Sequence, residues 1–450
     1  MHISSMENMD RCYRRFVAGT ELESRERLIV LDLGGADVNG SYRDVFRGPQ
    51  YDYRGADLVA GEGVAIVLES AYEIPLEDAS VDIVLSGQML EHCEFFWKSF
   101  EEMVRVLKPS GFIFLIAPSA GPIHRYPVDC YRFYPDAYAA LARYTDCEMV
   151  DVWMDERGPW NDLTGIFRKK GAPALPAAAQ PAHDAEPPFA GRGSDEEEAA
   201  KGSVSTFEVL EKLHTALKPE SYFEIGARDA RGLSLAHCPA LGIGPHAGAL
   251  GALRENIRTV AAASGDYFFE HRGKPALDTP PDLVFLDGAR FFETMLLDFM
   301  QVERLSRPST LVVVNNVLPA HAAQGARERR TALWAGDVWK LYETLRRQRP
   351  DLVLTLLDTH PTGLLLICGL DPHDDSLWKG YNAVIDEYGG GSAVPPEVLS
   401  RAAALAPEPA LLSALGKALR QERGRGPRVF RVRKKLQKLQ KLFASDAAHA

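Results

Sequence analysis

The chain has 450 residues, of which 46% are hydrophobic and 25% are charged, and its formal net charge is −11. This length favours two or three domains, and the composition excludes a fibrous or wholly disordered protein. The six cysteines form no C-x-x-C pair, which argues against a zinc site and a disulfide framework. There is no recognisable signal peptide and no apolar run of the ~18 residues that span a bilayer, so we expect a cytoplasmic protein.

The first predicted strand covers residues 28–31 and runs into an acid and a cluster of glycines. Asp32 follows the apolar run, and Gly34, Gly35 and Gly40 follow the acid. A buried strand that leads into a glycine-rich turn is where doubly wound α/β folds bind nucleotide-like ligands. The dinucleotide fingerprint G-x-G-x-x-G is absent, which disfavours an NAD-dependent oxidoreductase. Taken alone, the motif could also be a plain structural turn.

Further strands follow in chain order, after a helical lead-in over residues 1–26. They are predicted at residues 52–57, 64–68, 81–87 and 112–117. Residues 95–107 carry apolar side chains at helical spacing, and residues 108–111 are expected to stop that helix. Strands that alternate with helices predict a parallel sheet with right-handed crossovers. Asp57 ends the second strand, where a carboxylate can accept two hydrogen bonds from a ribose diol or can simply be a surface acid.

These segments together resemble the class I S-adenosylmethionine-dependent methyltransferases of the subgroup called type 11, over residues 28–145. The resemblance rests on five segments in order, which are L-D-L-G at 31–34, Asp57, residues 75–84, L-E-H at 90–92 and R-V-L-K-P-S-G at 105–111. It implies S-adenosylmethionine as the cofactor. This cofactor has no pyrophosphate and so needs no phosphate-binding helix terminus.

The resemblance also implies which residues contact the cofactor. Asp32, Gly34 and Gly35 are expected beside the methionine moiety, and Asp57 at the ribose. The adenine is expected to be flanked by Glu69, Ser70 and Ala71. The sulfonium is expected to face Gln88 and Glu91. One position departs from the family pattern, because Ala36 stands where members usually have a second glycine.

The acceptor side is expected in residues 118–134, which follow the fifth strand and mix aromatic with charged side chains. Candidate proton acceptors are His92, His124 and Asp129, and candidate substrate contacts are Arg125, Tyr126 and Arg132. The alternative is an aromatic lid whose polar groups pair only with one another. We expect no metal site, and a glycan or nucleotide-sugar as the acceptor.

A proline-rich, alanine-rich and acidic stretch at residues 171–203 predicts a disordered linker after a first domain at residues 1–170. A second domain at residues 204–372 repeats the plan of the first. Its strand-and-turn segments are predicted at residues 221–229, 282–288 and 310–316. We interpret this as a tandem duplication of one fold.

The second domain resembles another methyltransferase subgroup, called type 24, but with altered positions. Gly244 stands where that subgroup usually has a ribose-binding acid, Arg290 where it has histidine, and Asn315 where it has an acid. Related metal-dependent members hold a divalent cation at the positions of Asp287 and Asn315, and replacing a carboxylate by an amide weakens such binding. We therefore expect the second domain to be degenerate.

The helical tail, residues 373–450, ends in a basic amphipathic segment. Residues 425–443 contain eight Lys or Arg and no acid. An apolar stripe at helical spacing is formed by Val429, Val432, Leu436, Leu439 and Phe443. Such a helix can lie on a membrane surface, bind another polyanion, form the seam of a homodimer or be a frayed terminus.

The expected fold is therefore two tandem Rossmann-like, doubly wound α/β sheets of the class I methyltransferase type with a helical tail. The expected activity is methyl transfer from S-adenosylmethionine by a cytoplasmic enzyme, which the basic tail could hold at a membrane periphery. The alternative is a non-catalytic scaffold in a polysaccharide-assembly complex. Retention of Asp57, Glu91 and His92 in the first domain speaks against the scaffold.

Overall fold

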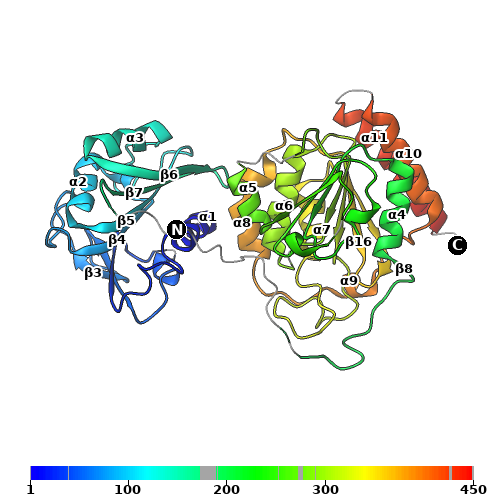
Figure 1. Ribbon diagram of the computed structural model, residues 1–450, viewed down its shortest axis with the longest axis horizontal. Coiled ribbons are helices and arrows are strands. Elements are labelled where there is room, and N and C mark those ends of the chain that lie inside the picture. Colours follow the sequence, from blue (N-terminus) through cyan, green and yellow to red (C-terminus); the bar gives the residue numbers. More distant parts are fainter. Residues whose placement is uncertain are drawn as a thin grey trace. The chain divides into compact units, whose positions relative to one another are not determined.

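The computed structural model describes residues 2–38, 40–172, 189, 191–251, 253–271, 277–288, 290–424 and 428–447. The chain divides into two compact units (Figure 1). The first comprises Met1–Pro181 with Trp378–Ala383, and the second comprises Ala182–Leu377 with Val384–Ala450. Of the stretch that we expected to be a disordered linker, residues 173–188 and 190 lie outside the described residues.

The end of that stretch makes specific hydrogen bonds within the second unit. The carboxylate of Glu198 accepts from the backbone N–H groups of Ala332 and Leu333, at 2.7 and 2.8 Å. The side chain of Gln324 donates to the carbonyl oxygens of Glu197 and Ala199. Residues 197–199 are therefore tied to the second unit by paired polar groups.

In the described residues of the first unit, seven strands form one mixed sheet in the order β3-β2-β1-β4-β5-β7-β6. Their bounds are Leu28–Leu33 (β1), Tyr51–Asp57 (β2), Val64–Val67 (β3), Val81–Gly87 (β4), Leu107–Pro118 (β5), Cys147–Asp155 (β6) and Asp162–Lys169 (β7). Strands β1 to β5 run parallel, as predicted. Strand β7 is antiparallel to both neighbours, and neither it nor β6 was predicted.

Helices cover both faces of this sheet. They are α1 (Ile3–Phe16), α2 (Phe96–Val106) and α3 (Pro135–Tyr144), with short 3-10 helices η1 (Tyr42–Asp44) and η2 (Leu90–His92). Helix α2 buries Phe100, Met103 and Val106, whose helical spacing puts them on one face toward the sheet. The helix ends at Val106, where the sequence predicted a stop, and residues 108–111 belong to β5, which begins at Leu107.

The second sheet has the same strand order, β11-β10-β9-β12-β13-β16-β14. Its strands are Tyr222–Ile225 (β9), Ala240–Gly244 (β10), Ile257–Ala261 (β11), Leu283–Leu286 (β12), Leu311–Asn315 (β13), Val353–Leu357 (β14) and Leu364–Cys368 (β16). Again the first five in sequence are parallel, and β16 is antiparallel to both of its neighbours, β13 and β14. A separate parallel pair joins β8 (Val204–Ser205) to β15 (Thr359–His360).

The duplication extends to the turn after the first strand of each sheet. Gly34 and Gly226 both have positive φ, +80° and +90°, a conformation that glycine adopts without steric cost. The N–H of Gly34 donates to Ala56 O at 2.9 Å, and that of Gly226 donates to Ile243 O at 2.8 Å. The predicted fold class, two tandem Rossmann-like α/β sheets followed by helices, is confirmed.

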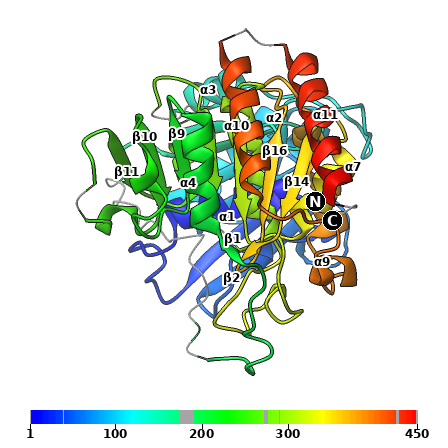
Figure 2. The ribbon, with the colours of Figure 1, turned by 90° about the vertical axis from the view of Figure 1, so that its right-hand side faces the viewer.

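The helices that accompany the second sheet form layers on its two faces. They are α4 (Thr206–Leu217), α5 (Ser264–Glu270), α6 (Phe292–Leu305), α7 (Lys340–Gln348), α8 (Ser376–Tyr388), α9 (Pro396–Ser400), α10 (Pro409–Arg423) and α11 (Val429–Ala447), with 3-10 helices η3 (Leu233–Leu235) and η4 (Ala247–Ala249). Figure 2 shows α4, α10 and α11 side by side over one face. None of the helices in the described residues is both long and apolar enough to cross a membrane.

The apolar stripe of α11 packs against its own unit. Val432 and Leu436 are each 2% exposed, and Leu439 and Phe443 pack against the same hydrophobic core. The expectation that this stripe meets lipid or a second copy of the chain was therefore wrong. Burial against α10 and the sheet already removes these side chains from water.

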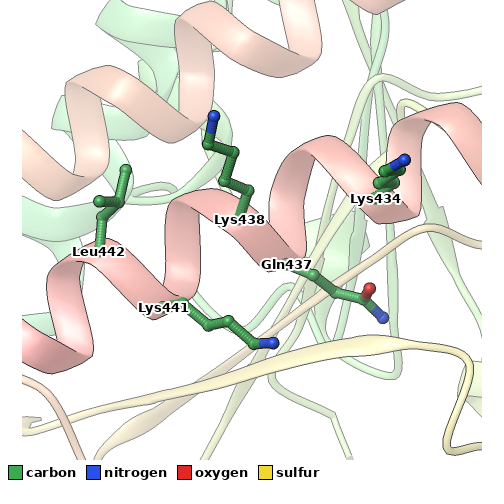
Figure 3. A pocket seen from close by; sticks show the side chains of 5 residues that line it. All are labelled: Lys434, Gln437, Lys438, Lys441 and Leu442. Carbon is green, nitrogen blue, oxygen red and sulfur yellow. The ribbon is translucent and has the colours of Figure 1, made fainter.

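The basic side of α11 is only partly available. Arg431 and Lys435 form ion pairs with Glu422, and Arg433 pairs with Asp351. Lys434, Lys438 and Lys441 are exposed and line an open pocket with Gln437 and Leu442, all on α11 (Figure 3). These three ammonium groups are the part of the helix that can meet an anionic partner.

Candidate functional site

The turn after β1 is built around a buried acid. The side chain of Asp32 is at the end of the strand, and the residue is 2% exposed. The hydroxyl of Tyr53, on neighbouring β2, donates to the carboxylate of Asp32 at 2.5 Å. Burial raises the pKa of Asp32 to about 7, an effect that the Tyr53 hydrogen bond partly offsets.

The next feature of this turn is the close packing of Gly35 against the backbone of β2. A Cβ atom on Gly35 would lie 2.7 Å from the carbonyl oxygen of Asp32 and 2.9 Å from the Cα of Gly55, so a side chain would force the backbone to move. Asp57 ends β2 and is half-buried, with one carboxylate oxygen accepting from Val59 N at 3.3 Å. Asp32, Gly35 and Asp57 thus lie at the carboxyl ends of neighbouring parallel strands, where this type of fold binds ligands.

The residues expected at the adenine follow β3. The backbone N–H of Leu68 donates to Asp57 O at 2.8 Å and brings this segment beside the end of β2. Glu69 is exposed, the hydroxyl of Ser70 accepts from Tyr72 N, and Ala71 O accepts from the Ser99 hydroxyl at 2.6 Å. The segment is therefore held next to Asp57, and its role toward an adenine remains a prediction.

Glu91 is the most unusual group at this edge of the sheet. It lies in η2 just after β4 and is 0% exposed, yet neither carboxylate oxygen has a hydrogen-bond partner in the described residues. Burial raises its pKa to about 8. A buried carboxyl group without partners is costly to a fold, which points to a ligand that supplies a donor or a positive charge.

Gln88 marks the start of the same segment. It has a positive φ of +58°, which is uncommon for a residue other than glycine. Its side-chain amide donates to Asp162 at 3.0 Å, and the other Asp162 oxygen lies 2.7 Å from His2 Nε2. The amide of Gln88 is thereby fixed toward β7, while its backbone N–H bonds Ile116 O.

The expected acceptor loop, residues 118–134, is clamped onto η2. The N–H of Cys130 donates to Glu91 O at 2.7 Å, and His92 Nδ1 donates to Val128 O at 2.6 Å. The rings of His92 and His124 meet edge to face with centroids 4.7 Å apart. The structure therefore brings His92 and His124, which were both expected in the site, beside Glu91.

Asp129 and Arg132 pair with each other. The Arg132 guanidinium donates to both Asp129 oxygens at 2.6 and 2.9 Å, and His124 N donates to the same carboxylate at 2.7 Å. These donors hold the pKa of Asp129 far below its usual range. This pairing favours a positioning role for Asp129 and Arg132 over proton transfer or substrate contact. Arg125 and Tyr126 are exposed, Tyr126 by 73%.

Several residues of the site were not expected from the sequence. Tyr53 supports Asp32, Asp162 holds Gln88, and the Trp160 ring lies 4.4 Å from that of His124. Residues 160 and 162 come from the start of β7, the antiparallel strand that was not predicted. These residues could have been predicted only by pairing β7 with β5, because that pairing brings them to the site.

The equivalent edge of the second sheet is arranged differently. Gly244 ends β10, where the first sheet has Asp57 at the end of β2. Asp287 accepts from the side-chain amides of Asn315 and Asn316 at 3.0 and 2.9 Å, and Arg290 lies 3.5 Å from it. Asp287 is thus occupied by internal donors, while Glu224, which stands where the first sheet has Asp32, is retained and buried.

Comparison with known proteins bears on the first unit. Residues 49–115 match the family model described as a methyltransferase domain. This part of the chain is therefore similar to methyltransferase domains. An uncharacterized methyltransferase of Mycolicibacterium gilvum is similar to it, with 32% identity over 134 residues, 27% of this chain and 51% of the relative. One from Mycobacterium bovis BCG is 33% identical over 95 residues, 19% of this chain and 37% of the relative. The chain thus spans about half or less of these relatives.

Solved structures of similar proteins include other methyltransferases. One is the Burkholderia thailandensis 1,6-didemethyltoxoflavin-N1-methyltransferase with bound 1,6-didemethyltoxoflavin and S-adenosylhomocysteine. It is 17% identical, with a TM-score of 0.30, and covers 37% of this chain and 78% of its own. Another is an S-adenosylmethionine-dependent methyltransferase from Aquifex aeolicus, 17% identical with a TM-score of 0.25, covering 36% of this chain and 96% of its own.

Proposed function

We propose that this chain transfers a methyl group from S-adenosylmethionine to an acceptor bound at the carboxyl edge of the first sheet. The observation that carries the proposal is the set of carboxyl groups that this methyltransferase domain places there. Asp32 and Asp57 lie at the carboxyl ends of β1 and β2, and Glu91 follows β4; these three strands are neighbours in the sheet. In an open α/β sheet of this kind, ligands bind at the carboxyl ends of the parallel strands, which is where these three side chains lie.

The residues present fit the cofactor. S-adenosylmethionine carries a ribose diol and an amino group, which are donors, and a positive charge at sulfur, from which it supplies an activated methyl carbon. The first unit offers acceptors that lack donors, most clearly the buried carboxyl group of Glu91. Asp57 is half-buried at the end of β2, as a carboxylate that accepts from a diol must be.

The work left to the protein is orientation and the exclusion of water. The turn at Gly34 and Gly35 lets the backbone come close to a ligand. The loop of residues 118–134, hydrogen-bonded to η2, covers the other side. If the acceptor must lose a proton and no metal ion occupies the His124 ring nitrogen, His124 is the best-placed base, because its side chain is 36% exposed while that of His92 is 13% exposed.

The acceptor that we propose is a glycan or nucleotide-sugar. Large apolar side chains stand exposed on the acceptor loop, including Ile123, Tyr126 and Tyr134, which are 71%, 73% and 58% exposed. Exposed aromatic rings can cover the flat face of a sugar or base. We propose further that the second unit is degenerate, and that Lys434, Lys438 and Lys441 hold the protein at an anionic membrane surface.

The remaining alternative is a scaffold without catalytic activity. The two functions are separated by incubating the full chain with S-adenosylmethionine carrying a labelled methyl group and a panel of glycans and nucleotide-sugars. Methyl transfer predicts label on one acceptor and its loss in Asp57→Ala. A chain that binds a polysaccharide-assembly partner but neither binds the cofactor nor releases S-adenosylhomocysteine would support the scaffold and refute methyl transfer.

A further inference from the structure

Two imidazoles and a carboxylate converge at the acceptor side of the first unit. The ligand-capable atoms of Glu91, His92 and His124 all lie within 4.8 Å of one another. Nε2 of His92 is 3.6 Å from Glu91 Oε1, and Nε2 of His124 is 4.0 Å from the same oxygen. Within the described part of the chain, this is the one group of three histidine, cysteine or acidic side chains so arranged.

His92 is oriented as a metal-binding histidine usually is, and His124 has a carboxylate near its other ring nitrogen. Nδ1 of His92 lies 2.6 Å from Val128 O, and a carbonyl can only accept, so the proton is on Nδ1 and the lone pair on Nε2. Nδ1 of His124 lies 3.5 Å from Arg132 Nη2, which can only donate, and 3.4 Å from Asp129 Oδ2. Binding a metal through Nε2 of His124 therefore requires the ring proton to lie on Nδ1, where the Asp129 carboxylate can accept it. Metal-binding histidines typically donate their other N–H to a carbonyl or carboxylate in this way.

The carboxylate supplies the second, independent observation. Glu91 is fully buried, and neither of its oxygens has a hydrogen-bond partner in the described residues. The Trp160 ring packs against the His124 ring, with the two centroids 4.4 Å apart. A cation held between this carboxyl group and the two imidazole rings would supply the partner that the Glu91 oxygens lack.

The spacing is close to what a small dication needs. Ligand atoms about 2.0–2.2 Å from a tetrahedral metal lie roughly 3.4 Å from each other. The distances of 3.6 and 4.0 Å from the carboxylate oxygen to the imidazole nitrogens exceed this value by about 0.2 and 0.6 Å, and all the ligand atoms lie within 4.8 Å of one another. A side-chain rotation on the partly exposed loop of His124 can close that difference.

We propose that Glu91, His92 and His124 form a binding site for a divalent first-row transition metal ion. Two imidazoles and one carboxylate suit zinc or iron(II) and leave at least one coordination position open. The sequence predicted no metal here because its cysteines form no C-x-x-C pair, and these ligands come from two separate segments. The open position lies on the acceptor side, where an oxygen, nitrogen or sulfur of a bound molecule could coordinate.

The site can be tested without cofactor or acceptor, so its outcome is independent of the proposed methyl transfer. Chelator-treated full-length protein is titrated with Co²⁺, whose visible absorption reports four- or five-fold coordination, and then with Zn²⁺ in competition. We expect one equivalent of each ion to bind. Glu91→Gln and His124→Ala should each weaken the affinity for Zn²⁺ by at least about tenfold, since losing even an outer contact of a metal site costs about 10–100-fold.

His373→Ala is the matched control, because His373 is exposed and belongs to the second unit. It should bind metal as the unaltered chain does. Thermal unfolding of metal-free Glu91→Gln shows whether that variant is folded, and if it is not, the result for His124→Ala decides. Failure to bind one equivalent, or equal affinity in the unaltered chain and His124→Ala, would overturn the proposal.

Discussion

Tyr53 donates its hydroxyl to the buried carboxylate of Asp32, and this 2.5 Å hydrogen bond joins β2 to the turn that ends β1. The two residues lie on neighbouring strands, with Asp32 paired in register with Gly55. Burial raises the pKa of Asp32 to about 7, well above the value of about 3.9 for an unfolded chain. Ionising Asp32 therefore costs folding free energy as the pH rises from about 4 to 7, and Tyr53 reduces that cost.

Tyr53→Phe should destabilise the first unit by about 1–3 kcal/mol at pH 8, because it removes a donor from a buried, ionised carboxylate. The loss should be smaller at pH 5, where Asp32 is mostly protonated in the folded state. Denaturant unfolding of the full chain at both pH values measures this, with Tyr126→Phe as the exposed control. An equal loss at pH 5 and pH 8 would show that the hydroxyl does not support the charge.

Asp57→Ala should weaken S-adenosylmethionine binding by about tenfold or more, because a charge-assisted hydrogen bond to the ribose would be lost. Asp44→Ala is the control, since Asp44 is also an acid of the first unit but lies exposed in η1. Calorimetric titration of each full-length variant gives the affinities. Unchanged binding by Asp57→Ala would remove this residue from the site.

The sequence alone predicted the five parallel strands of the first sheet and the glycine-rich turn that follows β1. Short apolar runs ended in acids and glycines, and each became a parallel strand. The sequence could not place β6 and β7, because their antiparallel insertion beside β5 depends on tertiary pairing. For the same reason Trp160 and Asp162 were missed, although they touch His124 and Gln88.

In the tail, the sequence predicted the helix correctly but did not indicate what would cover its apolar face. The spacing of Val432, Leu436 and Leu439 predicted an amphipathic helix, and α11 is one. A periodic stripe says that one face will be buried but not what will cover it. Here α10 and the second sheet cover it.

His214 makes the stability of the second unit depend on pH. Burial lowers its pKa to about 4, below the value of about 6.5 in an unfolded chain. The folded state thus disfavours the protonated form, and the stability present above pH 6.5 should fall by up to about 3 kcal/mol as the pH falls to 4. His214→Phe, which keeps a ring beside Tyr222, should lose less stability over this range. An identical pH profile in both proteins would contradict the assignment.

The exposed lysines of α11 should bind anionic vesicles in a salt-sensitive manner. Replacing Lys434, Lys438 and Lys441 by Gln should remove roughly 1 kcal/mol per charge near an acidic membrane. The fold should be unaffected, since all three side chains are exposed. Vesicle sedimentation at low and high salt measures the effect, with neutral lipid as the control. Equal sedimentation of both proteins on anionic vesicles would eliminate the basic face as a membrane contact.

The central claim is that the first unit alone binds S-adenosylmethionine, and the number of sites per chain tests it most directly. Calorimetric titration of the full-length protein should show one site, weakened by Asp57→Ala and unchanged by Asp287→Asn, which alters the equivalent edge of the second sheet. Asp287 is already occupied by Asn315 and Asn316. No binding, two sites per chain, or a single site that is lost in Asp287→Asn but kept in Asp57→Ala would contradict the claim.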